Sequence, residues 1–272
     1  MRPLLGTYIE VGVRAASTRA TERAAHAAFD TIGLVHRHMS FHDAASDLSR
    51  LNAEPGRTID VHPFTLQVLR LAKAAMTASG SGFDCTVGGL LVGRGALPDH
   101  GGPSPLPRGV ASDIVLGRGW ARLRRPVRLT LDGIAKGYAV DRAVATLRQQ
   151  GAEAGWINAG GDLRVFGDMA LPVQQRQLDG TIVPLGALRD AAVATSRVPL
   201  DEAPDDDFPA CLVAPGTARP APGVWTVLAR SAWRADALTK VAAATPAERR
   251  AGEIARLGGC LVEPAHGARM AA

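Results

Sequence analysis

Cysteine is scarce in this sequence, and its placement excludes two classes of small protein. The chain of 272 residues has three cysteines, Cys85, Cys211 and Cys260, which stand far apart and form no CxxC pair. An odd number of isolated cysteines indicates neither a disulfide framework nor a zinc knuckle. We therefore expect all three to be small buried side chains.

Long hydrophobic runs and a targeting segment are also lacking. No apolar stretch approaches the roughly 18 residues that a membrane-spanning helix needs. The first residues, MRPLLGTYIE, do not combine a charged segment with a following apolar one, as a secretory signal does. As written, the sequence is expected to be cytoplasmic and to have no membrane span.

Charge of one sign is present only in mild excess. The 31 Lys and Arg residues outnumber the 26 Asp and Glu residues, and the densest basic run is RLRRPVR at 122–128. The net charge of +5 is compatible with a phosphorylated ligand, but it is too diffuse for a nucleic-acid interface. We interpret the basic run as the solvated flank of a strand.

The sequence does contain enough apolar residues for a sizeable core. Hydrophobic residues make up 46% of the chain, and no sharp linker divides it, so we expect a single domain over residues 1–272. Strand-like and helix-like stretches are interspersed without the strict rhythm of a doubly wound sheet. This pattern predicts an α+β fold in which a mixed sheet packs against helices.

Periodicity and turn residues predict the individual elements. Apolar residues at three- and four-residue steps, including Ala25, Ala28 and Met39, mark one face of a helix over 18–39. Pro63 opens a second helix that ends near Gly80. The other predictions are a strand at 7–13, a loop at 97–109, a helix closed by Gly151, a hairpin over 155–168, an acidic loop at 197–210, a strand at 223–232, an alanine-rich helix over 234–245, a capping box at 245–248 and a strand at 260–263.

A glycine-flanked corner, LTLDGIAKGYAVD at 129–141, is the first candidate site. It opens like a strand and runs into helical spacing, yet it fits neither the GxGxxG nor the GxxxxGK[ST] pattern of nucleotide-binding loops. Gly133 and Gly137 let the backbone approach a ligand closely, and Lys136 can neutralise a phosphate at the start of the helix. A purely structural corner explains the same residues equally well.

A second candidate lies in the alanine-rich helix. The stretch ADALTKV at 235–241 places Asp236 within one turn of Thr239 and Lys240, so the three side chains can share one helix face. Carboxylate and hydroxyl oxygens suit a hard cation such as Mg²⁺. Taken alone, Asp236 is more simply explained as a helix-start carboxylate stabilised by the helix dipole.

Two further stretches combine aromatic and polar residues. In GFDCTVGGLL at 82–91, Phe83 can stack on a heterocycle while Asp84 forms hydrogen bonds with its ring nitrogens. A buried phenylalanine beside a turn-capping aspartate is the simpler interpretation. The stretch SFHDAASDLSRLN at 40–52 contributes His42 in a loop after a helix, where a lone histidine is usually exposed.

In their order along the chain, these motifs resemble one known family. The stretches LLGTYIEV, SFHDAASDLSRLN, GFDCTVGGLL, LDGIAKGYAVD, INAGGDLRVFG, AVATS and ADALTK are similar, block by block, to the ApbE family of FAD:protein FMN transferases. The resemblance covers nearly the whole chain, and an ordered set is far more specific than any one motif. It implies an ApbE-like, T-fold-like α+β domain.

The resemblance also implies a substrate, a metal and a reaction. FAD would bind with Mg²⁺ at its pyrophosphate, and a Ser or Thr hydroxyl of a target flavoprotein in a redox complex would attack it, leaving FMN on the acceptor and releasing AMP. By motif position, Asp236 and Lys136 would be catalytic, and the backbone carbonyl of Gly133 would hold the metal with Asp236 and Thr239. The resemblance assigns contacts with the nucleotide to Leu5, His42, Gly82, Phe83, Asp84, Thr130, Lys136, Thr195 and Ser196.

Several positions depart from the family pattern. The family usually has Asp-Ala-Leu-Ala-Thr, whereas here Thr239 stands three residues after the aspartate and Lys240 stands four residues after it. An ammonium group at that step would repel Mg²⁺ or replace part of its charge. The family's histidine and aspartate are missing from CLVAPGTA, which begins at Cys211, and Arg197 replaces the glycine of the family's TSG.

These departures keep two other functions open. One is a catalytically lapsed protein that binds FAD without transferring FMN. The other is Mg²⁺-dependent hydrolysis of the FAD pyrophosphate, with water in place of the acceptor hydroxyl. AMP release without an acceptor would identify the hydrolase.

Overall fold

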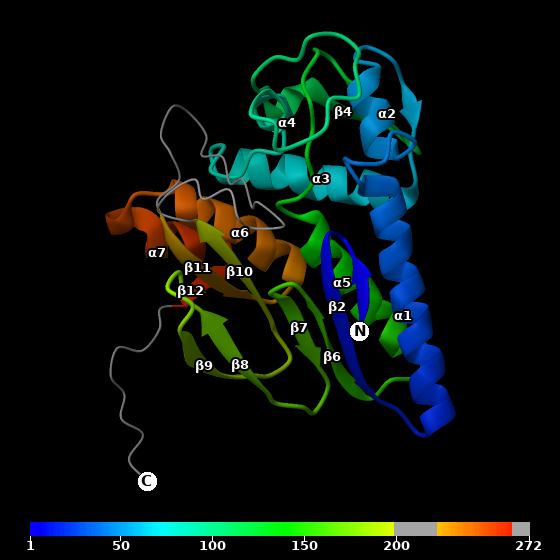
Figure 1. Cartoon of the computed structure of the whole chain (residues 1–272), viewed down its shortest axis with the longest axis vertical. Coiled ribbons are helices and arrows are strands. Elements are labelled where there is room, and N and C mark those ends of the chain that lie inside the picture. The colour runs from blue at the N-terminus through cyan, green and yellow to red at the C-terminus, as the bar shows by residue number, and fades with distance from the viewer. Residues whose placement is uncertain (199–221, 263–272) are drawn as a thin grey trace.

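The computed structural model describes residues 1–198 and 222–262, and its centre is a seven-stranded sheet (Figure 1). The strand order is β1-β2-β6-β7-β10-β11-β12, and every pairing is antiparallel rather than mixed. The strands predicted near 7–13, 155–168, 223–232 and 260–263 are confirmed. Their bounds, with the two strands that were not predicted, are β1 (Arg2–Leu4), β2 (Thr7–Arg14), β6 (Ala154–Ala159), β7 (Asp162–Phe166), β10 (Ala192–Val198), β11 (Gly223–Ala229) and β12 (Gly259–Val262).

Helices α5 (Ala135–Gln149) and α6 (Ala232–Ala244) lie on one face of this sheet, and α1 (Thr18–Met39) packs along α5 (Figure 1). Helix α1 starts as predicted, because Ser17 Oγ accepts the backbone N–H of Ala20 at 3.2 Å. Its buried face includes Ala24 in place of the predicted Ala25.

The opposite face of the sheet carries a hairpin of β8 (Leu171–Arg176) and β9 (Ile182–Leu188) over a small second core. Successive residues of a strand point to opposite faces. In β7, Leu163 and Val165 therefore reach this second core, while Asp162 and Arg164 face the helices. This alternation places the carboxylate of Asp162 in the region between α5 and α6.

A second group of elements lies beyond the ends of these helices (Figure 1). The helix predicted after Pro63 is confirmed, and its buried face includes Thr65 and Leu69, whereas Leu71 is only half-buried. The group comprises α2 (Asp47–Ala53), β3 (Ile59–Asp60), α3 (Pro63–Ala78), α4 (Gly88–Gly93), a 3₁₀ turn (Ala111–Asp113), β4 (Ile114–Leu116) and β5 (Trp120–Leu123). The loop predicted at 97–109 contains no helix or strand.

The segment before the glycine corner is not the strand that its sequence predicts. Asn52 Nδ2 donates to the carbonyl oxygen of Leu129 at 2.8 Å, and the Leu129 N–H donates to Asn52 Oδ1 at 2.7 Å. One side chain thus satisfies both backbone groups of Leu129, and the flanking Arg128 and Thr130 bond to backbone groups of the segment 85–88, so only an isolated bridge forms there. Arg128 is buried and donates to the carbonyl oxygen of Asn52 at 2.8 Å, so the basic run is not merely a solvated flank.

Three other predictions need correction or lie outside the described chain. The capping box at 245–248 is wrong, because Thr245 Oγ1 donates back to the carbonyl oxygen of Val241 at 2.7 Å and α7 (Ala247–Arg256) starts without a side-chain cap. Cys85 is buried as predicted, but Cys260 is exposed. Cys211 and most of the acidic loop at 197–210 fall outside the described residues.

Within the described ranges, no helix has the length and apolar character to cross a membrane.

Candidate functional site

The glycine corner and the alanine-rich helix meet in the folded chain. The backbone N–H of Gly137, in the first turn of α5, donates to Asp236 Oδ2 on α6 at 3.1 Å. A Cβ atom at position 137 would lie 2.3 Å from the carbonyl oxygen of Ala232, inside van der Waals contact. Glycine is required at this crossing, because any side chain would push the first turns of the two helices apart.

Asp141 completes the junction between α5 and α6. Its two carboxylate oxygens accept the backbone N–H groups of Ala232 at 3.0 Å and Trp233 at 2.9 Å, the first two residues of α6. Asp141 therefore caps α6 from a neighbouring helix, and it also pairs with Arg164 of β7. Sequence reasoning missed this role, because 91 residues separate the cap from the helix that it caps.

Asp236 is fully buried, and both of its carboxylate oxygens have partners. Oδ2 accepts the N–H of Gly137, and Oδ1 forms an ion pair with Lys240 Nζ one turn later on α6. Burial alone would favour the neutral acid, but the ammonium groups of Lys240 and Lys136 outweigh it and hold the pKa of Asp236 below its ordinary value. Asp236 therefore stays ionised, and the neighbouring ammonium groups balance its negative charge.

A short chain of hydrogen bonds links α6 to β10 beside this pair. Lys240 Nζ donates to Ser196 Oγ at 3.1 Å, and Ser196 Oγ lies 2.7 Å from Thr239 Oγ1. Thr239 Oγ1 also donates to the carbonyl oxygen of Asp236 at 2.7 Å. The predicted residues Ser196, Thr239 and Asp236 are thus brought together, but the hydroxyl of Thr239 is turned toward its own helix backbone.

A second lysine and carboxylate lie next to the first pair. Lys136 Nζ is 3.6 Å from Asp162 Oδ2 and 3.4 Å from the carbonyl oxygen of Asp132. Asp162 is 3% exposed, and its Oδ2 has no hydrogen-bond partner. Burial and the nearby charge of Asp236 raise the pKa of Asp162 to about 7, against the pull of Lys136. Asp162 follows the Gly-Gly turn of the predicted INAGGDLRVFG stretch, but its burial beside Lys136 has no signal in the sequence.

The stretch around Phe83 lies against the glycine corner and α6. A Cβ atom at Gly133 would be 3.2 Å from Phe83 Cε2 and 3.3 Å from Lys240 Cε, so both side chains flank the corner. A Cβ atom at Gly82 would be 3.3 Å from Val241 Cγ1, on α6. Phe83 is only 3% exposed, which agrees with the simpler prediction of a buried phenylalanine.

Three of the predicted stretches converge at one end of the main sheet. A Cβ atom at Gly160 would meet Thr7 Oγ1 at 2.4 Å, and one at Gly161 would lie 3.7 Å from the carbonyl oxygen of Thr195. Leu5, two residues before Thr7, has a positive φ of 56° in the turn between β1 and β2. The stretches that contain Leu5, the Gly-Gly turn and Thr195 are therefore neighbours, and Asp162 comes directly after that turn.

Other predicted residues make local contacts or point elsewhere. His42 is exposed, as expected of a lone loop histidine. Asp84 Oδ1 accepts the backbone N–H and the hydroxyl of Thr86 at 2.8 and 2.6 Å, so it caps a turn. Thr130 Oγ1 donates to Asp132 Oδ2 at 3.0 Å, at the start of the corner.

Thr195 points away from the cluster that contains its neighbour Ser196. Thr195 Oγ1 lies 2.8 Å from Thr226 Oγ1, which also accepts Gln175 Nε2 of β8 at 2.6 Å. The side chain of Thr195 therefore faces the hairpin of β8 and β9, whereas Ser196 faces α6, because adjacent strand residues alternate between faces.

The side chains as they stand do not fit a divalent cation. Mg²⁺ demands near-octahedral oxygen coordination, yet both oxygens of Asp236 are engaged and the ammonium of Lys240 adjoins one of them. In residues 1–198 and 222–262, no group of three or more His, Cys, Asp or Glu side chains is arranged to hold a metal. The arrangement favours ammonium groups as the positive charges of this site.

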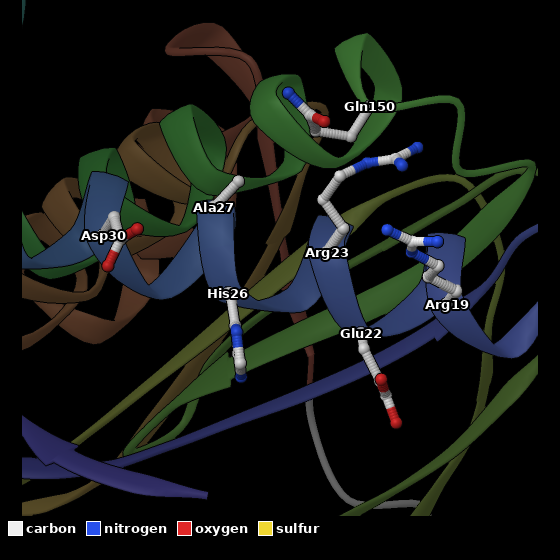
Figure 2. A pocket seen from close by; sticks show the side chains of 7 residues that line it. All are labelled: Arg19, Glu22, Arg23, His26, Ala27, Asp30 and Gln150. Atoms are coloured by element: carbon white, nitrogen blue, oxygen red, sulfur yellow. The ribbon is translucent and has the colours of Figure 1, made fainter.

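Two open hollows on the surface of the described residues lie along α1, away from this cluster. One is lined by α1 and Gln150, and Figure 2 shows that Arg23 extends toward Gln150 while Glu22 and His26 point away from it. Because these side chains diverge, the hollow does not assemble a set of groups around one ligand.

Comparison with known proteins decides to which family these features belong. A family model described as the ApbE family matches residues 5–260. The chain belongs to the ApbE family. A FAD:protein FMN transferase of Klebsiella pneumoniae (strain 342) is 30% identical over 148 residues, which cover 48% of this chain and 45% of that protein. The chain thus matches less than half the length of this relative.

Solved structures of ApbE proteins share the fold. The Thermotoga maritima ApbE protein has a TM-score of 0.77 at 23% identity, covering 96% of this chain and 91% of that one. The Pseudomonas stutzeri flavinyl transferase ApbE in its apo form has a TM-score of 0.75 at 20% identity, covering 93% and 85%. This likeness confirms the predicted α+β, ApbE-like fold.

Proposed function

We propose that this ApbE-family chain transfers FMN from FAD to a Ser or Thr hydroxyl of an acceptor flavoprotein in a redox complex and releases AMP. The observation that carries the proposal is the contact between Gly137 and Asp236, because it joins the two stretches predicted to bind the pyrophosphate. The name of the Klebsiella pneumoniae relative, a FAD:protein FMN transferase, supports the same reaction.

The reaction exchanges a phosphoanhydride bond for a phosphoester bond. The acceptor hydroxyl oxygen attacks the phosphorus on the FMN side of the pyrophosphate, and the bond from that phosphorus to the bridging oxygen breaks. AMP leaves with the bridging oxygen, and the hydroxyl proton passes to solvent. Positive groups that touch the phosphates stabilise the charge that develops on AMP.

Two lysines supply positive charge at the proposed site. Lys136 stands in the first turn of α5, where ammonium and helix N-terminus together favour an anion. Burial disfavours its charged form, but Asp162, Asp236 and Asp132 outweigh this effect and raise the pKa of Lys136, so it stays protonated. We assign Lys136 to the FAD phosphates. In this proposal Asp236 holds both the glycine corner and the side chain of Lys240 in position. The predicted nucleotide contacts of Leu5, Gly82, Thr130 and Ser196 remain part of this proposal.

The test is an incubation of the purified chain with FAD and a co-encoded flavoprotein, followed by mass spectrometry of that acceptor. We expect FMN on one Ser or Thr and an equal amount of AMP, and no product when that hydroxyl residue is replaced with alanine. AMP without labelled acceptor would indicate the hydrolase instead. FAD binding with no AMP in any condition would indicate a lapsed enzyme.

A further inference from the structure

The ammonium group of Lys240 lies at the centre of the contact between α6, β10 and the glycine corner. It pairs with Asp236 Oδ1 and donates to Ser196 Oγ at 3.1 Å, and the side chain is 19% exposed. Its Cε would be 3.3 Å from a Cβ atom at Gly133. Lys240 therefore lies among the residues to which the resemblance assigns a metal, namely Gly133, Asp236 and Thr239.

The partners of the predicted ligands leave little room for a metal beside this ammonium. Asp236 Oδ2 accepts the Gly137 N–H, and Thr239 Oγ1 is bonded to the carbonyl oxygen of Asp236. A divalent ion would have to displace Lys240 from a carboxylate that is fully buried. The displaced ammonium would then stand unpaired next to the metal, and the repulsion between the two cations opposes metal binding.

The acidic side chains around Lys240 leave no excess negative charge. Two ammonium groups, on Lys136 and Lys240, face two buried acidic side chains, Asp162 and Asp236, so the acids at most balance the lysines. A bound divalent cation would add two positive charges within a few ångströms of both lysines, where the low dielectric of the interior strengthens repulsion. An incoming pyrophosphate would instead find two ammonium groups and no excess negative charge.

We infer that Lys240 is the resident cation of this site, so that the chain holds a dinucleotide pyrophosphate with Lys136 and Lys240 and without a divalent metal. The inference rests on the proposed function for the identity of the ligand, FAD. It makes Lys240 a binding residue, and it turns Ser196 and Asp236 into the groups that hold the ammonium in place.

The first experiment measures FAD binding to the full chain by flavin fluorescence, once with EDTA and once with Mg²⁺. We expect dissociation constants that agree within about twofold, since a metal bridge worth 1.4 kcal/mol would already change them tenfold. FAD binding that is at least about tenfold weaker in EDTA would overturn the inference while leaving the proposed function intact. Failure to bind FAD in either condition would overturn the proposed function instead.

The second experiment needs no FAD and therefore decides the inference by itself. Mn²⁺, which suits the same oxygen ligands as Mg²⁺, is titrated into the chain and followed by electron paramagnetic resonance. We expect no bound Mn²⁺ in the wild-type chain and one bound ion in Lys240→Thr, which removes the ammonium and adds a hydroxyl. Mn²⁺ bound by the wild-type chain and lost on Asp236→Asn would overturn the inference, and so would a folded Lys240→Thr that binds none.

A matched variant separates charge from packing. Lys240→Met keeps an apolar stem of similar length but has neither ammonium nor oxygen. We expect it to bind FAD about tenfold or more weakly, with or without Mg²⁺, and to bind no Mn²⁺. Unchanged FAD affinity in a folded Lys240→Met would show that the ammonium does not touch the ligand, which overturns the inference.

Discussion

The backbone N–H of Gly137 lies 3.1 Å from Asp236 Oδ2, although 99 residues separate the two in the chain. The contact joins the first turn of α5 to α6 and places Lys136, the residue before Gly137, next to the buried carboxylate cluster. It also explains the glycine, since the carbonyl oxygen of Ala232 occupies the space of a side chain. The proposed site depends on this crossing.

Replacing Gly137 with alanine is expected to destabilise the fold. The new Cβ would meet the carbonyl oxygen of Ala232 at 2.3 Å, and a backbone atom cannot move aside without displacing α6. Overpacking of this kind lowers the free energy of unfolding by about 1–3 kcal/mol, which urea unfolding measures. The control is Gly33→Ala in α1, where nothing lies within 4 Å, and this change should stabilise by up to about 1 kcal/mol. Equal effects of the two changes would contradict the close crossing.

Asp141→Asn is expected to loosen the start of α6. Asparagine keeps one acceptor oxygen but loses the charge that faces Arg164 and one of the two caps on Ala232 and Trp233. A lost charge-assisted hydrogen bond lowers the free energy of unfolding by about 2 kcal/mol. The matched control is Asp190→Asn, because Asp190 pairs with Arg148 at the surface and such pairs contribute about 0–1 kcal/mol. If Asp190→Asn lowered the free energy of unfolding as much as Asp141→Asn, loss of the helix cap would not explain the effect.

Lys136→Met is expected to weaken FAD binding about tenfold or more, because one of the two ammonium groups at the pyrophosphate is lost. Calorimetric titration with FAD measures the dissociation constant. Lys73→Met is the control, since Lys73 donates to the carbonyl oxygen of Ile114 at 2.7 Å, in the contact of α3 with β4, and should leave FAD affinity unchanged. The assignment of Lys136 to the phosphates would be refuted by a folded Lys136→Met with wild-type affinity.

The contribution of His62 to the stability of the chain is expected to fall as the pH is lowered through the range where His62 titrates. Burial and the neighbouring His38 lower the pKa of His62 from 6.5, against the attraction of Asp47. Its neutral Nδ1 accepts the N–H of Phe64 at 3.1 Å at the start of α3, and protonation breaks this bond. Because the unfolded chain binds the His62 proton more readily, the contribution of His62 to the free energy of unfolding decreases from about pH 7 toward pH 5, whereas Asp162, whose pKa is raised to about 7, contributes in the opposite direction.

The pH effect is checked by urea unfolding of the wild-type chain and His62→Asn at several pH values. Asparagine also accepts a hydrogen bond from the start of a helix, but it does not titrate. The free energy of unfolding of the wild-type chain should therefore fall relative to that of the variant as the pH is lowered. Identical pH profiles for the two chains would show that His62 is not responsible.

Elements with a long, regular apolar pattern were predictable from the sequence. Helix α1 begins at Thr18 and ends at Met39, as the spacing of its apolar residues indicates. The motif order also indicated segments that meet in the fold, because the stretches around Phe83, Gly133 and Asp236 do come together. Local patterns and motif order carry this much information, since both are written in consecutive residues.

The remaining features depend on contacts between distant segments. Burial alternates along β8 and β9, but the sequence does not show this alternation, because the polar Gln175 is buried and the apolar Ile182 is exposed. The cap that Asp141 places on α6 and the unpartnered oxygen of buried Asp162 follow from how α5, α6 and β7 are arranged. No spacing within one stretch indicates either of them.

A crystal structure of the chain with FAD bound tests most directly whether α5 and α6 together hold the pyrophosphate. The predicted result places its two phosphates within hydrogen-bond distance of Lys136 Nζ and Lys240 Nζ, next to Gly133. Density for FAD at another place, with these ammonium groups still paired only with Asp162 and Asp236, would contradict the proposed site.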